Sequence, residues 1–153
     1  NEYLKWQKAI MNLNFNLSYI PHPSSISNHL DMDWLNIADI DNRGIKDIVN
    51  DYDIFFVDYS SSVISYLAAT NKPILFFDLG LRNMSAEYQE KLDDRAFVYH
   101  IDIFGNLESQ IRDAIKLYNE HKTDYVNNFT TSFSLHEKPE KNISNILKDI
   151  IFN

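Results

Sequence analysis

Two short polar segments, each directly after an apolar run, hold residue types that could bind an anion. The first is Pro21-His22-Pro23 and the second runs from Asp58 to Ser62. Serine hydroxyls and the unpaired N–H groups at the start of a helix can bind phosphate oxygens, and an imidazole can supply a further donor. The sequence therefore predicts a phosphate site that includes His22, Ser60, Ser61 and Ser62.

Each of these residues also has a purely structural explanation. Ser60 or Ser61 is equally suited to cap a helix, because a serine oxygen accepts from the first free N–H groups. His22, between two prolines, is also explained as part of a rigid turn. Asp58 follows an apolar strand and suits either a cap or an orienting group for a ligand, and Asp78 has the same placement after the next strand.

No metal or cofactor is expected. The remaining histidines lack partners at ligand spacing; they are His29, His100, His121 and His136. The acidic cluster Asp31, Asp33, Asp39 and Asp41 lacks the glycine and distal glutamate of an EF-hand, so we interpret it as a solvated loop.

Composition excludes several functional classes. The 153 residues carry a net charge of −8, which disfavours binding to a nucleic-acid backbone. Cysteine is absent, and neither a Walker loop nor a Gly-x-Gly-x-x-Gly loop occurs. No apolar run approaches the roughly 20 residues of a membrane-spanning helix. The chain begins with Asn1 rather than methionine, and we expect it to be a piece of a longer protein.

Apolar periodicity alternates between strands and helices. Strands are expected at residues 17–20, 34–38, 53–58, 73–78 and 96–101. Helices are expected at 3–13, 24–30, 43–51, 60–70, 107–118 and 139–151, with a polar helix or loop at 84–93 and a loop at 123–137. Strands that are apolar on both faces and alternate with helices indicate a parallel sheet. We therefore predict one α/β domain over residues 1–153, a Rossmann-like doubly wound sheet with ligands at the strand carboxyl ends.

The segment 52–62, followed by Lys72-Pro73 and an apolar strand, resembles the CDP-glycerol glycerophosphotransferase family of teichoic-acid enzymes. Pro21-His22-Pro23 is similar to the His-Pro segment of that family and of bacterial transferases that use CMP-sugars. The likeness covers roughly residues 15–105. Residues 136–140 depart from the Gly-Lys-Ala-Ser-like turn of the family, and Gly80-Leu81 departs from its Tyr- and Asp-rich segment.

The resemblance implies the C-terminal half of a GT-B glycosyltransferase fold that binds a CDP- or CMP-activated donor. His22 would contact the donor phosphates and act as acid or base, Ser60 and Ser61 would hold the phosphate, and Asp58 would position their loop. The acceptor would bind to an N-terminal half that this chain lacks. Such a protein would be cytoplasmic, or peripheral to the inner face of the plasma membrane through that missing half.

Three other interpretations remain open. A domain of the same architecture could use a UDP- or GDP-sugar. A degenerate GT-B half could only support a partner. A receiver-like or flavodoxin-like module could act through protein contacts, although no acidic pair follows the first predicted strand.

Overall fold

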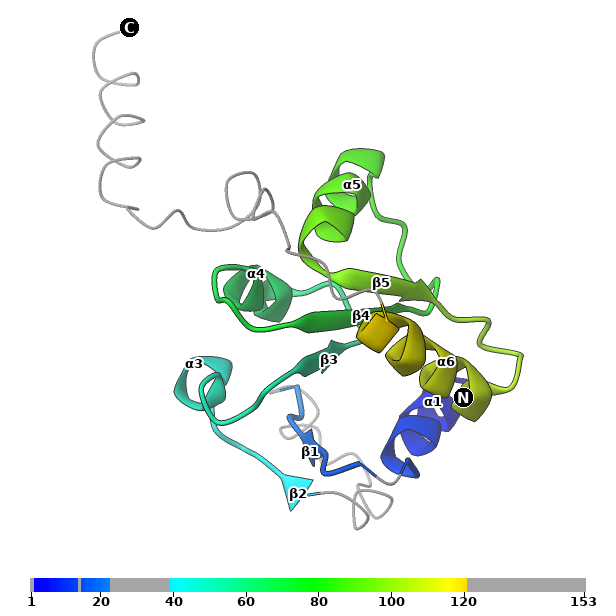
Figure 1. Cartoon of the computed structure of the whole chain (residues 1–153), viewed down its shortest axis with the longest axis horizontal. Helices are drawn as coiled ribbons and strands as arrows, with labels where there is room; N and C mark the ends of the chain where they lie inside the picture. The colour runs from blue at the N-terminus through cyan, green and yellow to red at the C-terminus, as the bar shows by residue number, and fades with distance from the viewer. Residues whose placement is uncertain (1, 14, 23–38, 121–153) are drawn as a thin grey trace, which may run out of the picture. The chain divides into compact units, whose positions relative to one another are not determined.

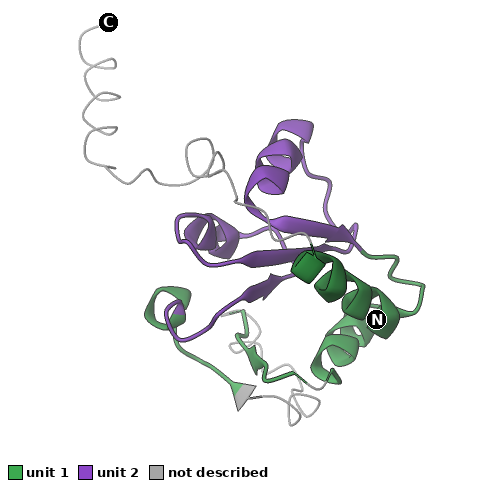
Figure 2. Cartoon of the chain, viewed as in Figure 1, with its two compact units in different colours: residues 1–48, 101–121 green, residues 49–100, 122–153 purple. Residues whose placement is uncertain are grey.

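A computed structural model describes residues 2–13, 15–22 and 39–120. The chain divides into two compact units, residues 1–48 with 101–121 and residues 49–100 with 122–153 (Figure 2). The elements expected at 24–30, 34–38, 123–137 and 139–151 lie outside the described residues. The prediction of a single domain over the whole chain stays a prediction, and each unit is described by itself.

The unit of residues 49–100 is built on a parallel sheet of β3 (Phe55–Val57), β4 (Ile74–Asp78) and β5 (Phe97–His100), in the order β3-β4-β5 (Figure 1). All three strands were expected, and their parallel pairing confirms a coarse α/β fold. The central strand β4 is buried over its first four residues. This burial explains why its sequence is apolar on both faces.

Two helices connect the strands, α4 (Ser62–Ala68) and α5 (Ala86–Arg95). The buried Arg95 at the end of α5 donates to backbone carbonyls at and after the end of α4, namely those of Leu67, Ala68, Thr70 and Lys72. Arg95 therefore ties the end of α5 to the end of α4 and the turn after it. Both helices lie on one face of the sheet, as two successive crossovers of the same hand require (Figure 1). The segment 84–93, ambiguous in the sequence, is helical, and Ser85 caps it by accepting from the Tyr88 N–H at 3.2 Å.

Hydrogen bonds of Lys72 and Pro73 connect the amino-terminal ends of β3 and β4. The Lys72 ammonium donates to the Tyr52 carbonyl at 2.8 Å, and the Phe55 N–H donates to the Pro73 carbonyl at 3.0 Å. Between the two strands the Phe56 and Phe77 rings meet edge to face, with centroids 5.6 Å apart. The Lys-Pro part of the motif is thus structural, at the end of the sheet opposite the serines.

The other unit contains α1 (Glu2–Met11), β1 (Ser18–Tyr19), β2 (Asp39–Ile40), α3 (Ile45–Ile48) and α6 (Leu107–Glu120). Helix α1 packs against α6 (Figure 1). Trp6 of α1 is fully buried. Strands β1 and β2 pair in parallel. The helix expected at 43–51 is shortened to the four residues of α3, and β2 was not expected. Within the described residues, no helix has the length and apolar character needed to cross a bilayer.

Candidate functional site

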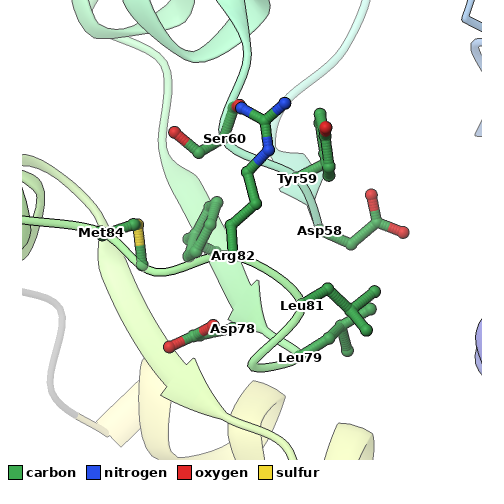
Figure 3. Close-up of a pocket in the computed structure, with 9 residues that line it drawn as sticks. Asp58, Tyr59, Ser60, Asp78, Leu79, Leu81, Arg82 and Met84 are labelled. Carbon is green, nitrogen blue, oxygen red and sulfur yellow. The ribbon is translucent and has the colours of Figure 1, made fainter.

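A pocket lies at the carboxyl end of β3 and β4, where the loops that lead into α4 and α5 meet. Its lining residues are Asp58, Tyr59, Ser60, Phe76, Asp78, Leu79, Leu81, Arg82 and Met84 (Figure 3). Carboxyl ends of parallel strands are where open α/β sheets bind ligands, so the pocket has the expected place in the fold. Asp58 and Ser60, both predicted from the sequence, belong to it.

Arg82 supplies positive charge to this pocket. Its side chain extends from its loop toward Ser60 and Tyr59 (Figure 3). The guanidinium carbon lies 4.3 Å from the centroid of the Tyr59 ring, and Nη1 donates to the Ser60 carbonyl at 3.2 Å. Arg82 is exposed, and one bond to a neutral carbonyl does not use all five of its N–H donors. It can therefore give further hydrogen bonds to an anion.

Arg82 holds the Ser60 carbonyl, and a residue of α5 holds the Ser60 hydroxyl. The hydroxyl donates to the phenol oxygen of Tyr88, on α5, at 2.7 Å. Burial raises the pKa of Tyr88 above its usual value of 10, although the Ser60 hydrogen bond and the Arg82 charge act in the other direction. The phenol therefore stays protonated at neutral pH, and the Ser60 oxygen keeps lone pairs for a donor group of a ligand.

Ser61 and Ser62 have structural places at the start of α4. Ser61 is the N-cap, and its side chain accepts from the Val63 N–H at 3.4 Å; Ser62 is the first helical residue and is exposed. Neither lines the pocket. Helix α4 has only seven residues, so its dipole offers an anion less than the sequence suggested. The positive charge at this site comes mainly from Arg82 instead.

The two carboxylates of the pocket differ in their surroundings. The Asp78 Oδ1 atom accepts from the Gly80 N–H at 2.9 Å, and its Oδ2 atom lies 3.0 Å from Nδ1 of His100. Asp58 is half-buried at the end of β3, and it does not cap α4, because Ser61 does. Among the described residues, no group of three or more His, Cys, Asp or Glu side chains is arranged to hold a metal ion.

His22 is exposed and belongs to the unit of residues 1–48 and 101–121, whereas the serines belong to the other unit. The expected approach of its imidazole to the serines therefore stays a prediction.

The pocket is small. Its volume of about 10 Å³ is room for a single water molecule. A larger ligand would extend out of the pocket into solvent, or would displace the Arg82 side chain or the loop 79–85. The exposure of Arg82 and of Leu81, at 53 %, allows such movement without opening the core.

No protein-family model matches the chain, and neither a curated protein nor a solved structure is detectably similar to it.

Arg82 was not among the site residues predicted from the sequence. Its only signal there is that it stands in the loop after a buried strand, in a chain with few basic residues. A single arginine in a loop forms no recognisable motif with its sequence neighbours, so the sequence alone does not indicate that it belongs to a site. The structure identifies it through its stacking on Tyr59 and its bond to the Ser60 carbonyl.

Proposed function

We propose that this chain binds the nucleotide-activated donor of a bacterial cell-surface polysaccharide or teichoic-acid transferase, with CDP-glycerol or a CMP-sugar as the donor. In this proposal the α/β unit is the donor-binding, C-terminal half of a GT-B fold. The observation that supports it best is the placement of Arg82 against Tyr59 and Ser60, two residues of the segment 52–62 that resembles the glycerophosphotransferases.

The charges of the pocket suggest how such a donor would lie. A phosphate would bind on the Arg82 side, because guanidinium groups bind phosphate through parallel hydrogen bonds. The adjacent Ser60 hydroxyl would turn its proton from Tyr88 to a phosphate oxygen. Asp58 and Asp78 would repel a phosphate but accept hydrogen bonds from hydroxyl groups. The ribose or the polyol of the donor would therefore lie toward them.

His22 would be the second donor to the phosphates and the acid or base of the reaction. Efficient turnover would also require an acceptor-binding half, since a GT-B enzyme closes two halves around donor and acceptor, so this chain by itself would transfer to a small free acceptor only slowly. The protein would be cytoplasmic, or peripheral to the inner face of the plasma membrane.

Titration with CDP, CMP, UDP, GDP and inorganic phosphate tests this proposal. At a CDP concentration ten times its Kd, binding stabilises the folded chain by about 1.4 kcal/mol, which raises Tm by about 3–6 °C. Chemical shifts of the Ser60 to Ser62 amides should move with CDP and CMP more than with phosphate. A preference for UDP or GDP would favour the alternative donor class.

Arg82→Ala should abolish the CDP-induced rise in Tm, and Ser60→Ala and His22→Ala should reduce it. Arg112→Ala removes an exposed arginine from α6 and serves as the matched control, with an unchanged shift. Absence of any shift at 10 mM nucleotide, or an equal shift in Arg82→Ala, would contradict the proposal.

A further inference from the structure

Asp78 and His100 are the last residues of two neighbouring parallel strands. They are register partners of β4 and β5, so their side chains emerge side by side at the carboxyl end of the sheet. Oδ2 of Asp78 lies 3.0 Å from Nδ1 of His100, and the two side chains are 18 % and 74 % exposed. The carboxylate is thus mostly covered, and the imidazole projects into solvent.

The carboxylate is fixed independently of the histidine. Its second oxygen accepts from the N–H of Gly80, which has a φ of +65° and begins the turn into the loop of Arg82. A carboxylate only accepts hydrogen bonds, so a neutral imidazole facing it must carry its proton on Nδ1. Nε2 then has a free lone pair that points away from Asp78.

The Asp78–His100 pair contributes little to the stability of the fold, because an ion pair with one exposed partner is worth on the order of 0–1 kcal/mol. A base whose far nitrogen is open and whose near nitrogen is held by a carboxylate is instead the arrangement of general-base catalysis. Asp78 also lines the pocket in which Arg82 and Ser60 lie.

We propose that Asp78 and His100 form a general base that activates the hydroxyl group of a polyol acceptor, a role that rests on the proposed donor-binding function. With CDP-glycerol as donor, Nε2 of His100 takes the hydroxyl proton while the acceptor oxygen attacks the phosphorus that bears the glycerol. An O–P bond forms, the P–O bond to the leaving CMP breaks, and its electron pair goes to CMP. Asp78 is the positioning residue that fixes the tautomer. With His100 as the base, His22 keeps the roles of phosphate donor and acid.

The tautomer can be measured directly. In long-range ¹H–¹⁵N spectra of the whole chain, His100 should show the Nδ1–H form. The Asp78→Asn amide can still accept from Gly80 N–H while its NH₂ faces Nδ1, so the ring should change to the Nε2–H form, which has no lone pair on the exposed nitrogen. Asp93→Asn, a matched change on α5 whose carboxylate accepts from Gln89, should leave His100 unaltered. The Nε2–H form in the unmodified chain would overturn the proposal.

The catalytic role is tested by release of CMP from CDP-glycerol with glycerol as acceptor, followed by ³¹P NMR. His100→Gln and Asp78→Asn should each lower the rate about 100-fold, while the CDP-induced rise in Tm of His100→Gln, whose side chain does not line the pocket, stays as large as in the unmodified chain. Asp93→Asn should release CMP at the unmodified rate. Equal rates in the unmodified chain and both variants, including no release from any of them, would overturn this inference alone. Absence of a CDP-induced rise in Tm in the unmodified chain would instead overturn the donor-binding proposal.

Discussion

The Ser60 hydroxyl donates to the Tyr88 phenol at 2.7 Å, across 28 positions of the sequence. This bond ties the loop after β3 to helix α5 and sets the direction of the one serine hydroxyl that lines the pocket. Because Arg82 holds the carbonyl of the same serine, Ser60 is fixed by both its side chain and its backbone. The loop after β3, the loop of Arg82 and helix α5 thus together fix the geometry of Ser60, a candidate ligand-binding residue.

Tyr88 should make the folded state sensitive to alkaline pH. Burial raises its pKa above 10, as burial also does for Tyr118, so the unfolded chain loses these protons first. The protonated Tyr88 phenol therefore contributes fully to the stability of the fold below about pH 10, the pKa of tyrosine in the unfolded chain. This contribution is lost as the pH rises through the higher pKa of Tyr88 in the folded chain. Urea unfolding at a series of pH values from 8 to about 11.5 should show a smaller decrease for Tyr88→Phe than for the unmodified chain. Tyr66→Phe, at a 40 % exposed site, is the control; equal decreases in all three would contradict the assignment.

Ser61→Ala should separate helix capping from ligand binding. Loss of the bond to the Val63 N–H removes an N-cap, which costs about 1 kcal/mol of unfolding free energy. The CDP-induced rise in Tm should persist, because the Ser61 side chain does not line the pocket. Ser62→Ala, at the exposed first helical position, should change the unfolding free energy little, as measured by urea titration. A larger loss for Ser62→Ala than for Ser61→Ala would refute this division.

Arg95 should be one of the most important polar residues for stability. It is 4 % exposed and donates to four backbone carbonyls at and beyond the end of α4. Arg95→Met keeps much of the side-chain volume but leaves buried carbonyls without donors, so we expect a loss of about 3 kcal/mol or more. Arg112→Met, at an exposed position of α6, is the matched control and should cost less than about 1 kcal/mol. Similar losses for the two variants in urea unfolding would show that the Arg95 bonds contribute little.

Much of the fold of residues 49–100 follows from local patterns. Runs such as Ile54 to Val57 and Ile74 to Phe77 have the length and composition of buried strands, and Ser61 has the residue type that starts a helix. Boundaries were less accurate, as in the helix of 43–51 that shrinks to α3, because helix ends depend on tertiary packing as well as on propensity.

The site was only partly predictable. Asp58 and Ser60 follow a recognisable strand and were found from the sequence, whereas Arg82 stands alone in its loop and was not. His100 was considered only as a metal ligand and was set aside because it has no partner at metal-ligand spacing. Its partner Asp78 lies on the neighbouring strand β4, 22 positions earlier in the chain. The two residues meet because β4 and β5 pair in parallel in this register, which the sequence alone does not show.

The sequence by itself determined the alternation of strands and helices and the polar residues that follow each strand, because both depend on periodicity and on neighbours a few positions away. Only the tertiary structure decided which of those polar residues meet. Strand register and the paths of the loops placed Arg82 against Ser60, and His100 against Asp78. Such contacts arise when whole elements pack to bury their apolar faces, and no short stretch of sequence encodes them.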